Sequence, residues 1–291
     1  MTAGQPAQRK ILVFGKTGQV ATELCRLAPV IALGRNKADL SKPEVCADAI
    51  HNLRPDVVIN AAAYTAVDHA EKDQDIAQRV NGDSPRIMAQ ACAACDIPFL
   101  HVSTDYVFDG HGHHPWKEDH AVNPLNAYGR TKLNGELGIR SAGGRHAILR
   151  TSWVFSAHGA NFVKTMLRLS ETHRELSIVN DQIGGPTPAQ DIAKTLLSIA
   201  DGLCKGKAGG TYHYNGQPEV SWADFVRCIF KMSGQEIGVH SIPTTDYPTP
   251  AKRPLNSRLD CAKLETEFGI KCPDWKVGLS SVLVELKREK V

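Results

Sequence analysis

A short apolar segment followed by a glycine-rich turn constrains the fold of this chain more than any other feature. The segment 11–14 has the character of a buried strand, and a helical pattern begins after the turn at 15–21. A strand that enters a helix through a tight glycine turn places the helix N-terminus where it can hold a pyrophosphate. The sequence therefore predicts a dinucleotide-binding unit at the start of the chain.

The glycines of this turn have different expected roles. Gly15 allows the tight turn and Gly18 lets the backbone approach a phosphate, while Ala21 stands where a third glycine usually serves helix packing. A P-loop would need another glycine five residues before Gly15, where the chain has Lys10, so nucleotide hydrolysis is excluded. The cofactor contacts expected from the turn are Gly15, Lys16, Thr17, Gly18, Gln19 and Val20.

Apolar segments alternate with helical patterns through the first half of the chain. This alternation predicts an α/β fold with a Rossmann-type doubly wound parallel sheet, and ligands at the carboxyl ends of the strands. The expected strands are 11–14, 30–33, 57–60, 99–102 and 147–149, and the expected helices are 40–53, 75–95 and 128–139.

The pattern loosens after residue 160, where turn-rich segments separate helices. We expect a dinucleotide-binding Rossmann domain over 1–160, to which later segments are free to return. The remainder, 161–291, is expected to be mainly a smaller substrate-binding part rather than a domain joined by a linker.

Composition narrows the function. Lys and Arg exceed Asp and Glu by three, without a dense basic stripe, so there is no electrostatic footprint for nucleic acid. No apolar run reaches the ~20 residues of a membrane span, and residues 1–10 lack the apolar core of a signal peptide. The eight cysteines lack the spacing of a disulfide framework. We expect a cytoplasmic protein that acts on a small molecule.

Tyr128 and Lys132 lie four residues apart within a predicted helix. Residues with this spacing share a helix face, and a nearby cation favours the phenolate of a tyrosine whose free pKa is roughly 10. The spacing alone is weak evidence, but the glycine turn in the same domain makes a hydride-transfer site the better interpretation. Thr104 adds a hydroxyl just after the predicted strand 99–102.

One cluster of cysteines and one of histidines resemble metal or redox sites, but neither is interpreted as one. Cys92 and Cys95 fall in an alanine-rich helical pattern without a second ligand pair, so packing is favoured over a redox or metal role. The histidines of the loop 111–120 are interpreted as part of a solvated surface. We therefore expect no metal-binding residues.

With the turn, Thr104, Tyr128 and Lys132 in place, the chain resembles the extended short-chain dehydrogenase/reductase superfamily and, within it, the dTDP-4-dehydrorhamnose reductase family. The resemblance covers nearly the whole chain through the segments 14–20, 54–63, 103–108, 150–154, 180–182 and 253–260. It implies NAD(P)H-dependent reduction of the C4 ketone of dTDP-4-dehydro-6-deoxy-L-mannose to dTDP-L-rhamnose.

The resemblance also implies roles for individual residues. Tyr128 would give a proton to the developing alkoxide, Thr104 would hydrogen-bond the same oxygen, and Lys132 would hold the nicotinamide ribose and lower the pKa of the tyrosine. The positions expected to line the sugar site are Asp105, Tyr106 and Trp153. Asn161 and Arg253 are further candidates for the nucleotide diphosphate, since a guanidinium pairs well with phosphate oxygens.

Cofactor choice depends on the end of the second predicted strand. No carboxylate stands there, and Arg35 is placed to meet a 2′-phosphate, so NADPH is favoured over NADH. Asp39 and Leu40 match the family's pair near the adenine. Other expected cofactor contacts are Ala61, Ala62, Ala63, Tyr64 and Val102. Some relatives depend on Mg²⁺, yet the sequence shows no dedicated carboxylate cage.

Other functions remain open at this point. A nucleotide-sugar epimerase, or a reductase that forms 6-deoxytalose, would use the same scaffold, because the sequence does not fix the stereochemistry at C4. Dehydratases of the superfamily commonly need a Glu after the strand-end acid, whereas here Asp105 is followed by Tyr106. A non-catalytic regulatory subunit is a further alternative, and a homodimer is compatible with each.

Overall fold

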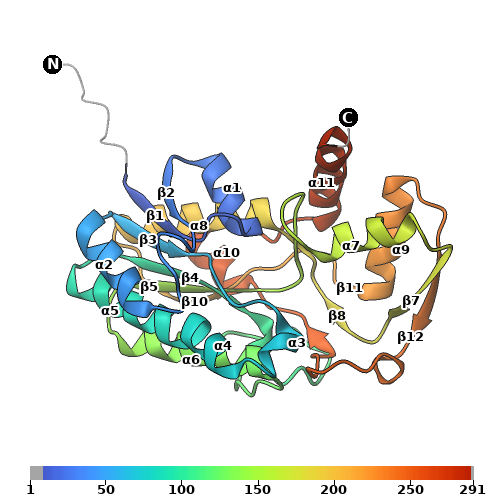
Figure 1. Ribbon diagram of the computed structural model, residues 1–291, viewed down its shortest axis with the longest axis horizontal. Coiled ribbons are helices and arrows are strands. Elements are labelled where there is room, and N and C mark those ends of the chain that lie inside the picture. The colour runs from blue at the N-terminus through green and yellow to red at the C-terminus, as the bar shows by residue number, and fades with distance from the viewer. Residues whose placement is uncertain (1–8, 290–291) are drawn as a thin grey trace.

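The computed structural model describes residues 9–289 and is built around one six-stranded parallel sheet. The order across this sheet is β10-β5-β4-β3-β1-β2, with all neighbouring strands parallel (Figure 1). The strands are β1 (Ile11–Phe14), β2 (Val30–Leu33), β3 (Val57–Asn60), β4 (Phe99–Thr104), β5 (His146–Thr151) and β10 (Gly210–His213). The predicted Rossmann-type fold is confirmed, and β10 adds a strand from the second half of the chain.

Helices cover both faces of the sheet, and alternate side chains of each strand pack under them. Val13 faces a core shared with α1 (Gln19–Leu27) and α8 (Ala189–Cys204). Leu12 and Phe14 face the opposite core. The helices on that side are α2 (Pro43–Leu53), α5 (Ser84–Ala94) and α6 (Ala127–Ser141). This two-sided cover explains the almost continuous apolar character of the strands.

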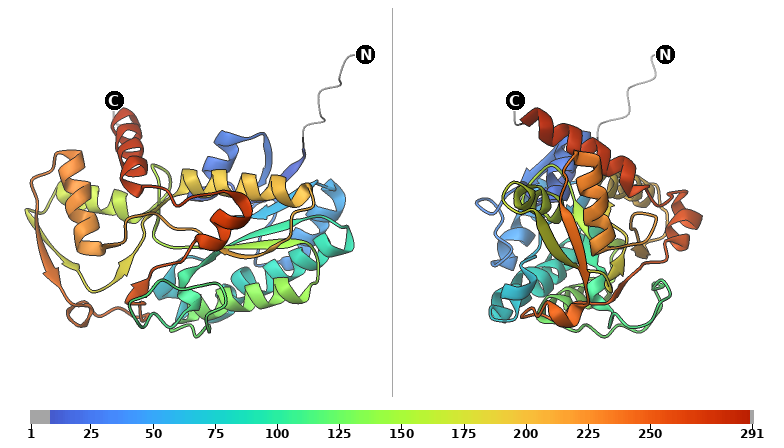
Figure 2. Two further views of the ribbon diagram at one scale, coloured as in Figure 1. Left: turned by 180° about the vertical axis from the view of Figure 1, so that it is seen from behind. Right: turned by 90° about the vertical axis from the view of Figure 1, so that its right-hand side faces the viewer.

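A smaller lobe lies beside the sheet and has its own aromatic core (Figure 2). Phe155, Phe225 and Trp275 are buried there. Its main elements are α7 (Phe162–Ser170), β7 (Glu175–Val179), α9 (Trp222–Ser233), β12 (Gly238–Ile242) and α11 (Trp275–Glu289). Strands β7 and β12 pair in parallel along their length. Segments of 161–291 thus contribute to both lobes, since α8 and β10 pack in the larger one.

Short elements complete the chain. The predicted helix 75–95 is interrupted by a π-helical turn, η1 (Arg79–Asp83), between α4 (Gln74–Gln78) and α5. The predicted helix 40–53 begins at Pro43, a residue favoured in the first helical turn. The other short elements are α3 (Val67–Ala70), η2 (Asp105–Val107), β6 (Val154–Phe155), β8 (Ile183–Gly184), β9 (Thr187–Pro188), β11 (Val220–Ser221), η3 (Thr244–Asp246), β13 (Asn256–Ser257) and α10 (Ala262–Phe268). Among the described residues, no helix combines the length and apolar character needed to cross a membrane.

Candidate active site

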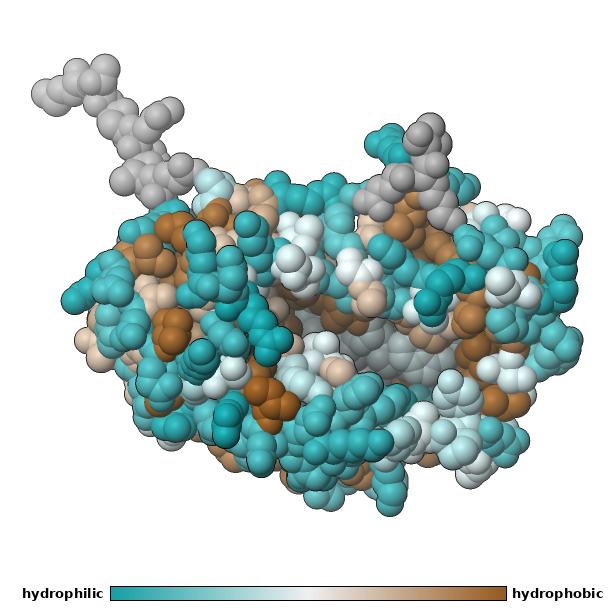
Figure 3. All heavy atoms as spheres, in the orientation of Figure 1, coloured by the Kyte–Doolittle hydropathy of each residue, from teal (hydrophilic) through white to brown (hydrophobic). Residues whose placement is uncertain are grey.

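The predicted catalytic residues meet where β4 ends and α6 begins. Thr104 is the last residue of β4, and its hydroxyl accepts a hydrogen bond from the Tyr106 backbone at 3.2 Å. Asn126 caps α6 by accepting from the Gly129 N–H at 2.8 Å. A Cβ on Gly129 would lie 2.2 Å from the Tyr106 carbonyl, so glycine allows α6 to approach η2 closely. In the space-filling view the face is hollowed between the two lobes (Figure 3).

Tyr128 lies in the first turn of α6 and keeps some exposure. Burial raises the pKa of its phenol, and the negative charge of Asp105 raises it further. The hydrogen bond with Thr104 acts against both and lowers it. The rings of Tyr128 and Tyr106 pack in a T-shaped arrangement, with centroids 5.5 Å apart. A phenol with a raised pKa stays protonated at neutral pH, which is the state that a proton donor needs. The expectation that Lys132 would lower this pKa is not met, because burial has the larger effect.

Lys132 lies one turn later and is almost completely buried, with 1% exposure. Its Nζ donates to the Val102 carbonyl at 2.7 Å and lies 2.9 Å from His101 Nε2. Burial lowers the pKa of Lys132 to about 7, while the charge of Glu136 raises it. Among the described residues no carboxylate forms a salt bridge with Lys132, and the carboxylate of Glu136 pairs with Arg140 and Arg150 instead.

Asp105 supplies a buried carboxylate beside these groups. Its Oδ1 accepts from the Thr104 hydroxyl at 3.1 Å, while Oδ2 has no hydrogen-bond partner within the described part of the chain. Burial raises the pKa of Asp105 to about 7, while the nearby hydroxyls of Ser257 and Thr104 lower it. An unpartnered buried oxygen is costly, so it marks a place where a ligand hydroxyl would be favoured.

Arg253 and Tyr106 are neighbours at the same end of β4. Burial raises the pKa of Tyr106 to about 12, and the hydrogen bond and charge of Arg253 lower it. Arg253 also forms a salt bridge with Asp68 at 2.7 Å. The structure thus brings Arg253, predicted from a segment far along the chain, next to the residues at 104–106.

Trp153 follows β5 in a backbone conformation that is unusual for a large side chain. Its φ is +49°, a region that costs on the order of 1–3 kcal/mol for a residue other than glycine. The ring stacks on Trp222 with centroids 3.6 Å apart, and a Cβ on Gly184 would lie 2.8 Å from the Trp153 ring. The smaller lobe therefore holds this predicted sugar-site residue through packing.

Asn161 has a local structural explanation. Its side-chain oxygen caps α7 by accepting from the Lys164 N–H at 3.2 Å. Its amide nitrogen donates to the carbonyls of Ser156 at 2.8 Å and His158 at 3.2 Å. Both ends of the amide are therefore engaged, and the predicted contact with a diphosphate has no geometric support.

The glycine turn has the geometry that its sequence predicts. Gly15 has a φ of +106°, and a Cβ there would lie 3.4 Å from the backbone of Ala61 and Ala62. Gly18 caps α1 and has open space where its Cβ would be. Lys16 and Thr17 are exposed, Val20 is buried, and Gln19 accepts from the Ser156 hydroxyl at 2.9 Å. The N-terminus of α1 is therefore accessible to an anion.

The remaining predicted cofactor residues lie at or after the carboxyl ends of β2, β3 and β4. The Arg35 side chain is 78% exposed and lies 3.5 Å from Asp39, whose carboxylate accepts from the Ser41 N–H at 2.9 Å. Leu40 is buried, and Ala61, Ala62 and Ala63 are half-buried after β3. The Tyr64 N–H donates to Asn81 at 2.8 Å. Val102 contributes its carbonyl to Lys132.

Sequence reasoning missed a set of buried polar residues behind the site. Asn60 and His101 are fully buried on neighbouring strands, and Asn81 lies in the π-helical turn η1. π-helical turns are frequently found at functional sites. The available signal was a polar side chain inside an apolar strand pattern, which is unusual because buried polar groups need partners.

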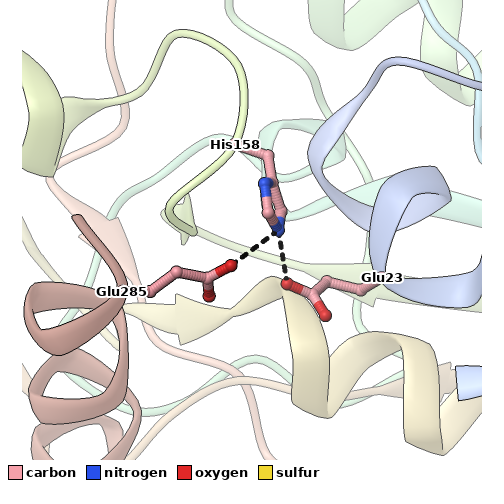
Figure 4. A group of neighbouring side chains, drawn as sticks. All are labelled: Glu23, His158 and Glu285. Atoms are coloured by element: carbon pink, nitrogen blue, oxygen red, sulfur yellow. Dashed lines mark hydrogen bonds and ion pairs between the residues drawn. The ribbon is translucent and has the colours of Figure 1, made fainter. Parts of the chain in front are cut away.

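One cluster away from these residues has the composition of a metal site (Figure 4). The ligand atoms of Glu23, His158 and Glu285 lie within 4.8 Å of one another. A guanidinium nitrogen of Arg26 contacts all three, at 3.3 Å from Glu23, 2.8 Å from His158 and 2.8 Å from Glu285. Arg26 thus supplies the positive charge, and the group does not fit the oxygen cage that Mg²⁺ prefers.

Comparison with known proteins agrees with this fold. The family described as RmlD substrate binding domain matches residues 9–288. A dTDP-4-dehydrorhamnose reductase from Sinorhizobium fredii is 44% identical, over 92% of this chain and 94% of the relative. The solved structure of such a reductase from Clostridium acetobutylicum is 36% identical, with a TM-score of 0.90 over 96% of this chain and 99% of that one. Another, from Bacillus anthracis in complex with NADP, is 30% identical, with a TM-score of 0.89 over the same shares. The chain therefore belongs to the dTDP-4-dehydrorhamnose reductase family.

Proposed function

We propose that this chain reduces the C4 ketone of dTDP-4-dehydro-6-deoxy-L-mannose to dTDP-L-rhamnose with NADPH. The observation that carries the proposal is the convergence of Thr104, Tyr128 and Lys132 at the carboxyl end of β4. Membership of the family and the NADP complex of one relative support the same activity.

The proposed chemistry needs one proton at the ketone oxygen. When bound, the reduced nicotinamide supplies a hydride to C4, so the cofactor is oxidised and the ketone is reduced. Tyr128 donates its phenolic proton to the developing alkoxide, and its raised pKa keeps that proton in place beforehand. The Thr104 hydroxyl stabilises the same oxygen by hydrogen bonding.

The proposed sugar site uses the unsatisfied groups around η2. The free Oδ2 of Asp105 would accept a hydrogen bond from a sugar hydroxyl. Tyr106 and Trp153 would line the site, and Arg253 would pair with the diphosphate. Asn161 is left out, because the cap of α7 engages its amide.

The proposed cofactor site follows the turn and the ends of β2 and β3. The N-terminus of α1 would hold the pyrophosphate, and Lys132 would hold the nicotinamide ribose. The exposed Arg35 would meet the 2′-phosphate of NADPH, although its contact with Asp39 would have to rearrange. A homodimer and a cytoplasmic location stay predictions from the sequence.

The decisive experiment follows NADPH oxidation by absorbance with enzymatically prepared dTDP-4-dehydro-6-deoxy-L-mannose, and identifies the product by NMR. We expect dTDP-L-rhamnose, and a loss of about 10²–10⁴-fold in kcat for Tyr128→Phe. Tyr247→Phe is the matched control, since Tyr247 is 57% exposed. A 6-deoxytalose product would correct the stereochemistry. No turnover with NADPH or NADH would favour an epimerase or a regulatory subunit.

A further inference from the structure

A chain of three buried polar side chains runs through the sheet to the candidate active site. Asn60 on β3 and His101 on β4 are register partners, and both have 0% exposure. Asn60 Nδ2 lies 3.1 Å from His101 Nδ1, and His101 Nε2 lies 2.9 Å from Lys132 Nζ. All three side chains are removed from water, so each polar atom needs a partner within the protein, and each pair must combine a donor with an acceptor.

The backbone fixes the direction of these hydrogen bonds. The Asn60 side-chain oxygen accepts from the Ala62 N–H at 3.1 Å, so the amide nitrogen is the atom that faces His101. An amide nitrogen only donates, which makes Nδ1 of His101 the acceptor. A neutral imidazole then carries its hydrogen on Nε2. Burial lowers the pKa of His101 well below its ordinary value, and any positive charge on Lys132 lowers it further, so the ring is neutral in either state of the lysine.

The hydrogen on Nε2 points at Lys132, and this has a consequence for the lysine. An ammonium group has only donors, whereas a neutral amine has a lone pair that accepts the Nε2–H. The Val102 carbonyl takes one Lys132 hydrogen at 2.7 Å. A charged Lys132 would need the other tautomer of His101, and the Asn60 amide would then have to turn and leave the Ala62 N–H without its acceptor.

Glu136 is the charged group near Lys132 that favours its protonated form, but this carboxylate is already paired with two arginines. Glu136, one turn later on α6, raises the pKa of Lys132, but it forms salt bridges with Arg150 at 2.7 Å and Arg140 at 2.8 Å. Tyr128, one turn earlier, is neutral with a raised pKa. Burial outweighs Glu136 and brings the pKa of Lys132 to about 7, in agreement with the hydrogen-bond directions.

We propose that His101 is a positioning residue whose Nε2–H hydrogen bond favours the neutral form of Lys132 over its charged form. The inference rests on the proposed function, since it concerns the lysine beside the proton donor Tyr128. Each reduction consumes one proton, which Tyr128 delivers and must recover. A neighbour that changes charge near neutral pH assists that recovery without leaving a fixed cation in the buried site.

The test is His101→Gln, because a glutamine amide can turn its oxygen toward a charged lysine. We expect the pH at which Lys132 titrates to rise by about one unit, and the high-pH limb of kcat/KM to move up with it. The titration is read by NMR of the lysine Cε carbons without substrate, and Lys132→Met assigns the resonance. The direct readout separates this inference from the proposed function, since it needs no turnover.

A second variant tests the route through the tautomer. Asn60→Asp keeps an oxygen that accepts from the Ala62 N–H, but it presents a second oxygen to His101 Nδ1. The hydrogen of the neutral ring then lies on Nδ1, and Nε2 is free to accept from a charged Lys132. We expect Asn60→Asp to raise the pKa of Lys132 in the native background and to raise it much less in the His101→Gln background. Equal shifts in both backgrounds would show a simple effect of charge and overturn the tautomer mechanism.

Other outcomes are also decisive. An unchanged Lys132 titration in folded His101→Gln, with a uniform fall in kcat/KM, would reduce His101 to a packing residue and overturn the proposal. If His101→Gln does not fold, His101→Asn, which has the same amide group, replaces it as the second background for Asn60→Asp. A Lys132 titration at or below the native pH in Asn60→Asp overturns the proposal in either case. A shifted titration in a protein without reductase activity would instead refute the proposed function and leave the link between His101 and Lys132 intact.

Discussion

Two buried basic side chains lie along helix α6, Lys132 in its first half and Arg150 of β5 against its second, and they differ in their partners. In its first half Lys132 has no salt-bridge partner among the described residues and reaches only His101 and the Val102 carbonyl. One turn later Glu136 faces the buried Arg150, with two hydrogen bonds at 2.9 Å and 2.7 Å. The hydroxyl of Ser103 donates to the same carboxylate at 2.6 Å.

The difference separates structural from chemical use of buried charge. The pKa of Glu136 is raised by burial but lowered overall, because Arg150, Ser103 and Arg140 all favour its charged form. A pair satisfied in this way keeps its charge over the working pH range and fixes the sheet to α6. Lys132 lacks such partners, so its charge responds to pH and to ligands.

The largest effect is expected from breaking the salt bridge between Glu136 and Arg150. Glu136→Gln leaves Arg150, which is 1% exposed, without a carboxylate, and we expect a loss of about 3–5 kcal/mol in the free energy of unfolding. Urea denaturation measures it, and Glu236→Gln on the exposed surface is the control. A loss below about 1 kcal/mol would show that Arg150 is satisfied without Glu136.

Lys132→Met should separate activity from stability. We expect kcat/KM to fall by about 10²–10⁴-fold, because the group beside Tyr128 and the ribose is lost. The free energy of unfolding should stay level or rise at pH 7, since a buried amine without a salt-bridge partner is replaced by an apolar side chain of similar length. A marked loss of stability would mean that Lys132 is a structural residue like Arg150.

The lowered pKa of Lys132 should also appear in the pH dependence of the free energy of unfolding. The folded pKa of Lys132 is about 7, below the ordinary 10.5, so the unfolded chain binds more protons between these values. Native stability should therefore rise with pH, by roughly 2 kcal/mol between pH 7 and 9 relative to Lys132→Met. Comparing the two proteins cancels other titrations, and parallel curves would contradict the lowered pKa.

Much of this arrangement follows from local sequence, and the rest from long-range contacts. The turn at 15–21, the strand-end Thr104 and the pair Tyr128 and Lys132 were predicted, since each depends on neighbours in the chain. Strand β10 was not, because four residues joining β5 from far along the sequence leave no local signal. Likewise His101 is visible in the sequence, but its partner Lys132 lies on another element.

Trp153 and Asn161 show the same limit for the predicted sugar site. The sequence places Trp153 after a strand, but its left-handed backbone and its stacking on Trp222 depend on the smaller lobe. Asn161 is a sequence-based candidate for the diphosphate, whereas in the structure its amide caps α7. A polar side chain near a site is therefore a weak prediction until its hydrogen bonds are known.

The smallest expected effect compares the two asparagine caps. Asn126→Ala and Asn161→Ala each remove a side-chain oxygen that accepts an N–H three residues later, so each should lower the free energy of unfolding by about 1 kcal/mol. Only Asn126 begins the helix that carries Tyr128, and it also donates to the Lys252 carbonyl at 2.7 Å. We therefore expect Asn126→Ala to lower kcat several-fold while Asn161→Ala leaves kcat and KM near native values.

Steady-state kinetics measures kcat and KM of both variants, and urea denaturation measures their free energies of unfolding. A raised KM for the nucleotide sugar in Asn161→Ala alone would restore the diphosphate contact predicted from the sequence, and equal kinetic effects would mean that helix capping does not determine where Tyr128 lies.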